Sequence, residues 1–356
     1  MDTFFTPGPA ALYPGIDTWI NEALEQQFLS ASHRSKTYVD VHKHAVAEVR
    51  KLFALPEDWN VFFFGSANEV WERLLQNCSL GLSYHFVNGA FSERFYRFSR
   101  DLHILSEATI VNWGKSFDFA NVTLPQNTGL IHFTHNETST GVMLREEDIY
   151  RFRGYSRALI TVDMVSSAPY ANLDWNMVDA AYFSVQKAFG LPAGLGVLLA
   201  GPRLLEREEQ IRSSGRTTGT YHSLNNMLKY AQKHQTPATP NMLGVFLLGK
   251  VAEAMNKKGI DVIRKETEEK AQFLYDYFAQ NPDFKTYVKR PTCQSKTVIV
   301  VKHKRSATLR KFLAERGLIV GDGYGKLGGK QLRIANFPAT SMEDMKRLVA
   351  AIDEFE

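Results

Sequence analysis

A lysine stands where a strand-forming run meets a turn rich in glycine and proline. The run Ala181–Val185 is followed by Gln186-Lys187, and the turn 188–194 leads back into an apolar run at 196–200. An amine beside a buried strand is costly to desolvate unless it is neutral or held covalently in a Schiff base. A lysine that forms a Schiff base does so by reacting with a carbonyl group. By itself, the stretch is equally typical of a surface lysine in a loop.

A carboxylate ends a second apolar run, Leu159–Asp163, 24 residues before Lys187 (187 − 163). Ligands of parallel sheets bind beyond the carboxyl ends of the strands, where both side chains are expected. Pyridoxal 5′-phosphate (PLP) requires both residue types: a lysine that reacts with its aldehyde and a carboxylate that pairs with its pyridine nitrogen. Taken alone, Asp163 could also cap a turn.

Three loops could complete such a site. Gly65-Ser66-Ala67-Asn68 places small residues between a strand and a helix, where backbone N–H groups can approach a phosphate. The loop 135–141 offers the hydroxyl of Thr138, and Asn88-Gly89-Ala90-Phe91 offers a ring to stack on a cofactor. An ordinary β–α turn and a core aromatic are the plainer interpretations.

The elements that must position these residues alternate between strands and helices. Apolar runs without a polar face are typical of a parallel sheet covered on both sides, and they lie at 61–64, 83–87, 130–134, 159–162, 181–185 and 197–200. Helices are predicted at about 17–28, 39–53, 69–77, 241–255, 261–280, 306–316 and from Thr340-Ser341 onward, with further strands at 298–301 and 331–337. We expect an α/β protein with a large, mostly parallel-sheet domain (1–255) and a small α+β domain (256–356).

Composition excludes several classes of protein. A net charge of +4 and 44% hydrophobic residues are ordinary for a globular chain and disfavour nucleic acid as a partner. Cys78 and Cys293 lack metal or redox spacing, which favours a reducing compartment. No run approaches the ~18 apolar residues of a membrane span, and the first residues lack the pattern of a signal peptide. We expect a cytoplasmic protein with no metal and no membrane partner.

In their order and separations, the motifs resemble those of the class V aminotransferases, which have the PLP-dependent type I fold of aspartate aminotransferase. The resemblance is strongest to the branch of that family that acts on phosphoserine. The matching segments cover nearly the whole length: Pro7–Ala10, Ser32–Lys36, Asn136-Glu137-Thr138, Asp163–Ser167, Gln186-Lys187, Thr236-Pro237 and Arg333–Pro338.

This resemblance implies roles for individual residues. Lys187 would form the Schiff base with PLP and move the proton during catalysis, and Asp163 would pair with the pyridine nitrogen. The other cofactor contacts would come from Ser66, Ala67, Phe91 in the place of a tryptophan, Thr138, Gln186 and, across a homodimer, Thr236. Arg333 would bind the α-carboxylate of the amino acid, a two-bond role that suits a guanidinium.

The expected substrate depends on His33 and Arg34. In the family, the loop that carries these two residues reaches into the active site of the partner subunit and binds a second anionic group of the substrate. The implied ping-pong reaction is L-glutamate plus 3-phosphohydroxypyruvate in equilibrium with 2-oxoglutarate plus O-phospho-L-serine, in serine biosynthesis. The chain departs from the family in three places. Where some members carry a His-Arg pair that binds the substrate phosphate, this chain offers Lys326 or Lys330, and we expect Lys326 to bind substrate. The turn 65–68 lacks an arginine, and Gln235 stands where an asparagine is common.

Three alternatives stay open. A class V aminotransferase for small substrates, of the alanine/serine–glyoxylate type, would not need His33 and Arg34. A cysteine desulfurase would need Cys293 as its mobile nucleophile, although its position just before the strand 298–301 favours a strand-edge residue. A non-catalytic binding protein of the PLP fold would react with no amino acid.

Overall fold

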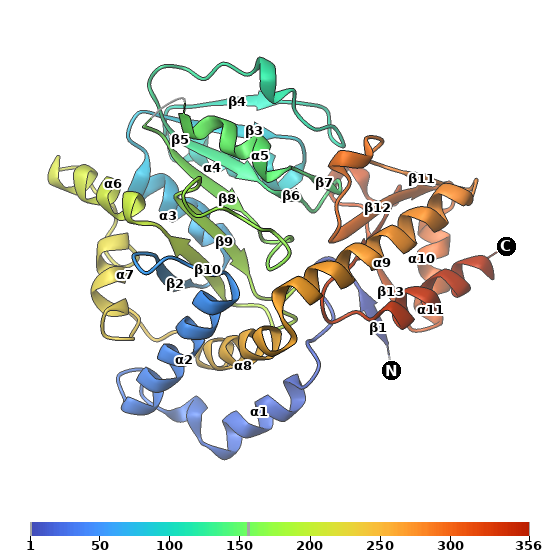
Figure 1. Cartoon of the computed structure of the whole chain (residues 1–356), viewed down its shortest axis with the longest axis horizontal. Coiled ribbons are helices and arrows are strands. Elements are labelled where there is room, and N and C mark those ends of the chain that lie inside the picture. The colour runs from blue at the N-terminus through green and yellow to red at the C-terminus, as the bar shows by residue number, and fades with distance from the viewer. Residues whose placement is uncertain (1, 155–156, 356) are drawn as a thin grey trace.

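A seven-stranded sheet forms the centre of the larger domain (Figure 1). The structure is a computed structural model that describes residues 2–154 and 157–355. The strand order is β2 (Asn60–Phe64), β10 (Gly196–Ala200), β9 (Ala180–Ser184), β8 (Leu159–Asp163), β5 (Thr128–Thr134), β3 (Leu82–Val87) and β4 (Ser106–Ile110). In the described sheet, β10 alone runs in the direction opposite to the other strands. The predicted mostly parallel α/β architecture is confirmed.

The direction of β10 follows from the length of the turn before it. Eleven residues, 185–195, separate the ends of β9 and β10. A parallel connection needs a crossover of about a dozen residues or more, usually with a helix. The short return therefore makes β10 antiparallel, and it leaves Lys187 in the turn at the carboxyl end of β9.

Helices cover both faces of this sheet, and alternate residues of the strands face opposite cores. In β2, Phe63 packs in one core, with residues of α2 (Lys36–Leu52) and α8 (Met242–Lys258), whereas Phe62 and Phe64 pack in the other. The helices around the sheet are also α1 (Ile16–Glu25), α3 (Ala67–Cys78), α4 (Ala90–Asp101), α5 (Glu146–Tyr150), α6 (Pro202–Ser213) and α7 (Leu224–Ala231). Single 3₁₀ turns lie at 28–30, 119–121, 151–154, 291–293 and 325–327.

A second, five-stranded sheet lies in the smaller domain, at the right in Figure 1. Its order is β1 (Thr3–Phe5), β13 (Leu318–Asp322), β14 (Leu332–Ala335), β12 (Val298–His303) and β11 (Phe284–Thr286). It packs with α9 (Ile260–Gln280), α10 (Ser306–Glu315) and α11 (Met342–Asp353). A two-stranded ribbon, β6 (Asn136–Glu137) with β7 (Val142–Met143), completes the described strands.

The N-terminal strand departs from the predicted assignment of residues 1–255 to the first domain. β1 pairs in parallel with β13 of the second sheet, because Phe5 is buried in the core of that domain. The division after residue 255 stays a prediction. The break between α8 and α9 lies at Gly259, whose φ of 90° ends the first helix. No described helix is both long and apolar enough to cross a membrane.

Candidate active site

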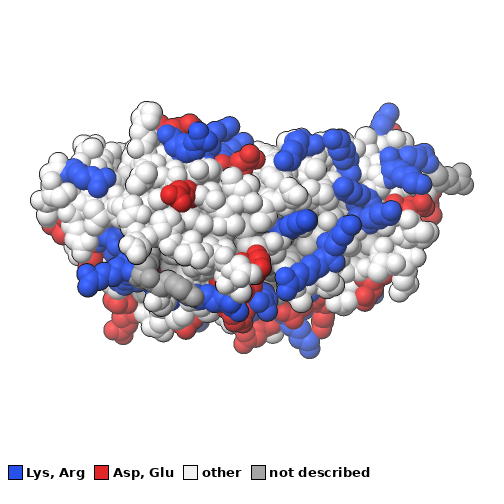
Figure 2. Space-filling model, turned by 90° about the horizontal axis from the view of Figure 1, so that it is seen from above, with Lys and Arg blue, Asp and Glu red and all other residues white. Residues whose placement is uncertain are grey.

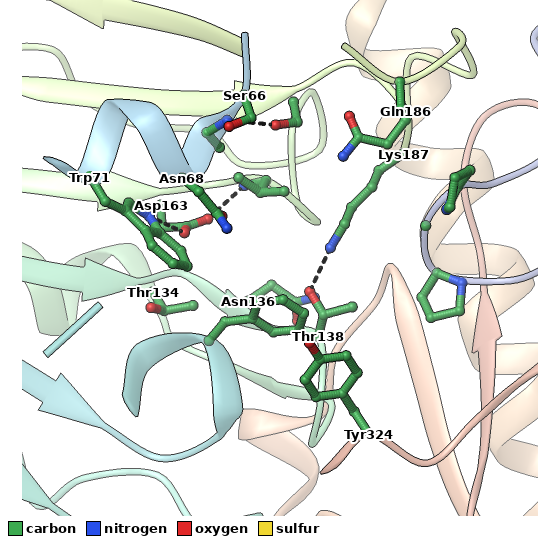
Figure 3. A pocket seen from close by; sticks show the side chains of 18 of the residues that line it. Ser66, Asn68, Trp71, Thr134, Asn136, Thr138, Asp163, Gln186, Lys187 and Tyr324 are labelled. Atoms are coloured by element: carbon green, nitrogen blue, oxygen red, sulfur yellow. Dashed lines mark hydrogen bonds between the residues drawn. The ribbon is translucent and has the colours of Figure 1, made fainter. Parts of the chain in front are cut away.

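A cavity of about 370 Å³ opens beyond the carboxyl ends of β5, β8 and β9. The starts of α3 and α4 form part of its wall, and the segment 7–9, Tyr324 and Arg333 close it from the side of the second domain. Eight of the predicted site residues line it: Ser66, Ala67, Phe91, Thr138, Asp163, Gln186, Lys187 and Arg333. Figure 3 shows Lys187 and Asp163 entering from opposite sides.

Lys187 is buried in this cavity, with 6% of its surface exposed. Its Nζ donates a hydrogen bond to Oγ1 of Thr138 at 2.9 Å, drawn in Figure 3, and lies 5.1 Å from the centre of the Phe91 ring. Burial lowers the pKa of Lys187; the Asp163 charge opposes this shift and the Arg333 charge adds to it. The amine can therefore lose its proton more readily than an ordinary lysine and act as a nucleophile.

Asp163 ends β8 with a buried carboxylate that already has two donors. Its Oδ1 accepts from the backbone N–H of Val165 at 2.9 Å and its Oδ2 from Nε1 of Trp71 at 3.1 Å. Burial raises the pKa of Asp163, while these bonds and the charge of Lys187 lower it. Each oxygen keeps a lone pair for a cationic ring nitrogen. Trp71 was missed by the sequence analysis, because its contact with Asp163 spans 92 residues.

The start of α3 lines the cavity next to β10. The Oγ of Ser66 caps this helix by accepting from the N–H of Glu69 at 3.2 Å, and the N–H of Ala67 donates to Oγ of Ser184 at 2.9 Å. A Cβ at Gly196 would lie 2.4 Å from the carbonyl carbon of Ser66, so only glycine allows this close approach. The positive end of a helix is suited to a phosphate.

The start of α4 is held by a buried carboxylate that the sequence analysis did not single out. Glu137 accepts from the backbone N–H groups of Ser92 at 2.9 Å and Phe91 at 3.3 Å. It thereby fixes the Phe91 ring, which stacks on Tyr324 with centres 5.0 Å apart. Tyr324 was also missed, because its place in the cavity depends on how the two domains meet.

Arg333 places a positive charge at the wall of the cavity that the second domain forms. Its Nε donates to the carbonyl of Asp322 at 2.5 Å and one terminal nitrogen to the carbonyl of Thr138 at 3.4 Å. Burial lowers the pKa of Arg333 to about 10, so the guanidinium stays charged at neutral pH. Its remaining N–H donors suit a carboxylate.

Four predicted site residues lie outside this cavity. Thr236, His33 and Arg34 are gathered elsewhere on the larger domain. Arg34 donates to the side-chain oxygen of Gln235 and to the carbonyls of Thr236 and Pro237, at 2.7–3.0 Å, and His33 lies 3.3 Å from Oγ1 of Thr239. These bonds use three of the five N–H donors of Arg34.

Lys326 also lies outside the catalytic cavity, 3.9 Å above the ring of Trp113. It lines a separate cavity beside α4, and Tyr324 belongs to the walls of both cavities.

The donor set of the cavity fits PLP. Lys187 suits the aldehyde, Asp163 the ring nitrogen, the start of α3 the phosphate and Phe91 one face of the ring. A further observation supports the fit. Asn136 donates to Oγ of Ser166 at 2.8 Å, but its buried Oδ1 has no hydrogen-bond partner within residues 2–154 and 157–355. A buried polar atom at the cavity wall leaves an acceptor available to a bound group.

Comparison with known proteins agrees with this chemistry. A family model described as aminotransferase class-V matches residues 111–328. A phosphoserine aminotransferase of Rhodococcus jostii (strain RHA1) is 30% identical over 357 residues, which cover 99% of this chain and 94% of that protein. The chain belongs to the class V aminotransferase family. It is therefore a PLP-dependent transaminase.

Solved structures share the fold throughout. The crystal structure of a phosphoserine aminotransferase from Cytophaga hutchinsonii matches with a TM-score of 0.98 and 42% identity, over 99% of both chains. An aspartate aminotransferase from Thermus thermophilus matches over the full length of both chains, with a TM-score of 0.85 and 24% identity. The latter supports the fold alone, which is the PLP-dependent type I fold predicted above.

Proposed function

We propose that this enzyme transfers the amino group between L-glutamate and 3-phosphohydroxypyruvate, yielding 2-oxoglutarate and O-phospho-L-serine, in the cytoplasmic synthesis of serine. The observation that carries the proposal is the 42% identity to the phosphoserine aminotransferase from Cytophaga hutchinsonii over 99% of both chains. The catalytic cavity supports it, because a buried lysine, Lys187, and a half-buried arginine, Arg333, face the same space.

Each cavity residue has a distinct task in this proposal. Bound PLP supplies the electron sink that makes the Cα proton of an amino acid removable. Lys187 would hold PLP through its aldehyde, and its lowered pKa would let Nζ take and return the Cα proton of the substrate. Asp163 would pair with the ring nitrogen and keep it protonated, and Arg333 would orient the substrate through its α-carboxylate. Ser66, Ala67 and Gln186 would hold the phosphate of PLP, and the hydroxyl of Thr138 accepts a hydrogen bond from Nζ of Lys187.

We also propose a homodimer with shared active sites. Arg34 binds the segment 235–237 of its own chain, so His33, Arg34 and the buried Thr236 form one unit. This unit lies outside the catalytic cavity of its own chain, as expected if it serves the cavity of a second copy. There, Thr236 would contact the cofactor phosphate, and the two basic residues would bind the second anionic group of the substrate.

The test is a half-reaction on the PLP-loaded protein, followed by the absorbance of the cofactor. O-phospho-L-serine and L-glutamate should discharge the absorbance band, whereas L-serine and L-alanine should not. Lys187→Ala should bind PLP without the Schiff-base absorbance, keep its fold by circular dichroism and lose turnover. Retained turnover in this variant would sink the proposed mechanism.

A transaminase for small substrates is the second candidate, and one observation favours it. Among the described residues that line the catalytic cavity, the cationic side chains are Lys187 and Arg333. Binding of a second anionic group of the substrate would therefore need cations from outside this cavity. Discharge by L-alanine or L-serine as efficient as that by O-phospho-L-serine would establish this alternative.

A further inference from the structure

A second cavity, of about 470 Å³, lies beside the catalytic one, on the other side of Tyr324. We call it the α4 cavity. Its walls are α4, the segment 110–113 after β4, and the loop that carries Tyr324 and Lys326. Tyr324 is the one described residue that lines both cavities.

Four cations surround the α4 cavity. Arg94, Arg97 and Arg100 recur every three residues along α4, so they lie along one face of the helix, and Lys326 faces them from the second domain. Glu93 is the one carboxylate among the described lining residues. None of the four cations forms an ion pair with any residue the structure describes, and like charges at this spacing repel one another.

Overall charge does not account for this cluster, because the chain carries a net charge of only +4. On the face drawn in Figure 2, lysines and arginines gather in separate groups, with acidic side chains mostly along one edge. Four unpaired cations around one hollow therefore need a local explanation. An anion that neutralises them would remove their mutual repulsion.

We propose that the α4 cavity is a binding site for the phosphate group of a small molecule. Three guanidinium groups can each offer two parallel N–H donors to phosphate oxygens, and Lys326 adds a point charge. Trp113 and Tyr96 also line the space and supply apolar surface for the carbon part of such a ligand.

Tyr324 connects this site with the catalytic cavity. Its hydroxyl accepts from a terminal nitrogen of Arg94 at 3.1 Å, and its ring stacks on Phe91 and lies 5.5 Å from the guanidinium carbon of Arg333. A phosphate that draws Arg94 away would release the Tyr324 hydroxyl. The phosphate has two possible sources, a free phosphate compound or the far end of a substrate held by Arg333.

The test is calorimetric titration of the PLP-loaded enzyme with inorganic phosphate, which does not depend on the proposed transaminase substrate. Removing two guanidinium groups in an Arg97→Gln/Arg100→Gln variant should weaken phosphate binding about tenfold or more. Lys346→Gln, which removes an exposed cation from α11, is the matched control and should bind phosphate like the wild type. Thermal unfolding checks that all three proteins are folded.

The half-reactions of the same proteins distinguish the two sources. If the double variant needs more O-phospho-L-serine but not more L-glutamate, the site receives the phosphate of the substrate. If phosphate binding falls while both half-reactions are unchanged, the ligand is a separate phosphate compound. Unchanged phosphate affinity in the double variant, or no binding by the wild type, would overturn the proposal.

Discussion

Replacing Trp71 by phenylalanine tests whether the indole N–H positions Asp163. The variant keeps an aromatic ring to stack on Phe95 but loses the donor 3.1 Å from Oδ2. A hydrogen bond to an ionised group contributes about 1.5–3 kcal/mol. If the whole contribution is felt in the transition state, kcat falls about 10- to 150-fold.

The pH dependence of the same variant gives a second, independent measurement. Burial raises the pKa of Asp163, and the hydrogen bond from Trp71 is one of the contacts that oppose this shift. Without the bond, the pKa of Asp163 rises further. Since the carboxylate must be charged, the acidic limb of kcat/KM should move to higher pH.

The matched control is Trp59→Phe. Trp59 is equally buried but packs against Trp175, in the core around α2 and α8. It should lower stability without changing kcat or the pH profile. The reasoning is refuted if Trp71→Phe retains the kcat and the acidic limb of the wild type while remaining folded and loaded with PLP.

Two further predictions concern stability and the approach of α3. Burial lowers the pKa of His42 to about 4, that of His85 to about 3 and that of His132 well below its ordinary 6.5. As the pH falls below 6.5, the unfolded chain therefore binds protons on these histidines before the folded chain does. The free energy of unfolding, measured by urea denaturation, should fall between pH 6.5 and 4 by up to about 1.4 kcal/mol per pH unit for each histidine. Equal free energies of unfolding at pH 7.5 and 5 would contradict this. In the Gly196→Ala variant, the added Cβ would lie 2.4 Å from the carbonyl carbon of Ser66 and should push the start of α3 away. Titration of the apoenzyme with PLP should therefore show a weaker affinity. An unaltered affinity would show that the helix can shift freely.

The residues that could be predicted from the sequence are those whose position is set by a local pattern. Lys187 and Asp163 each stand at the end of an apolar run, so the ends of β9 and β8 could be predicted from the sequence alone. The buried strands were predicted for the same reason. β4 was not, because it is a half-exposed edge strand with the polar sequence Ser-Glu-Ala-Thr-Ile.

What the sequence could not supply depends on contacts between distant segments. Trp71 reaches Asp163 across 92 residues, and Glu137 reaches the start of α4 across 45. Tyr324 enters the cavity from the second domain. No local periodicity distinguishes such residues from ordinary core or loop residues, because their roles arise from tertiary packing.

The pairing of β1 with β13 has a consequence for how the enzyme matures. Thr3 lies beside Leu318, so the ribosome releases β1 some 315 residues (318 − 3) before its partner strand exists. The edge of this sheet cannot close until residues 318–320 have been made. The segment 7–9, which follows β1 and forms a wall of the catalytic cavity, also waits for that event. A nascent chain therefore lacks this wall of its active site until β13 has been made, and a fragment beginning at residue 256 would lack the edge strand that Phe5 anchors.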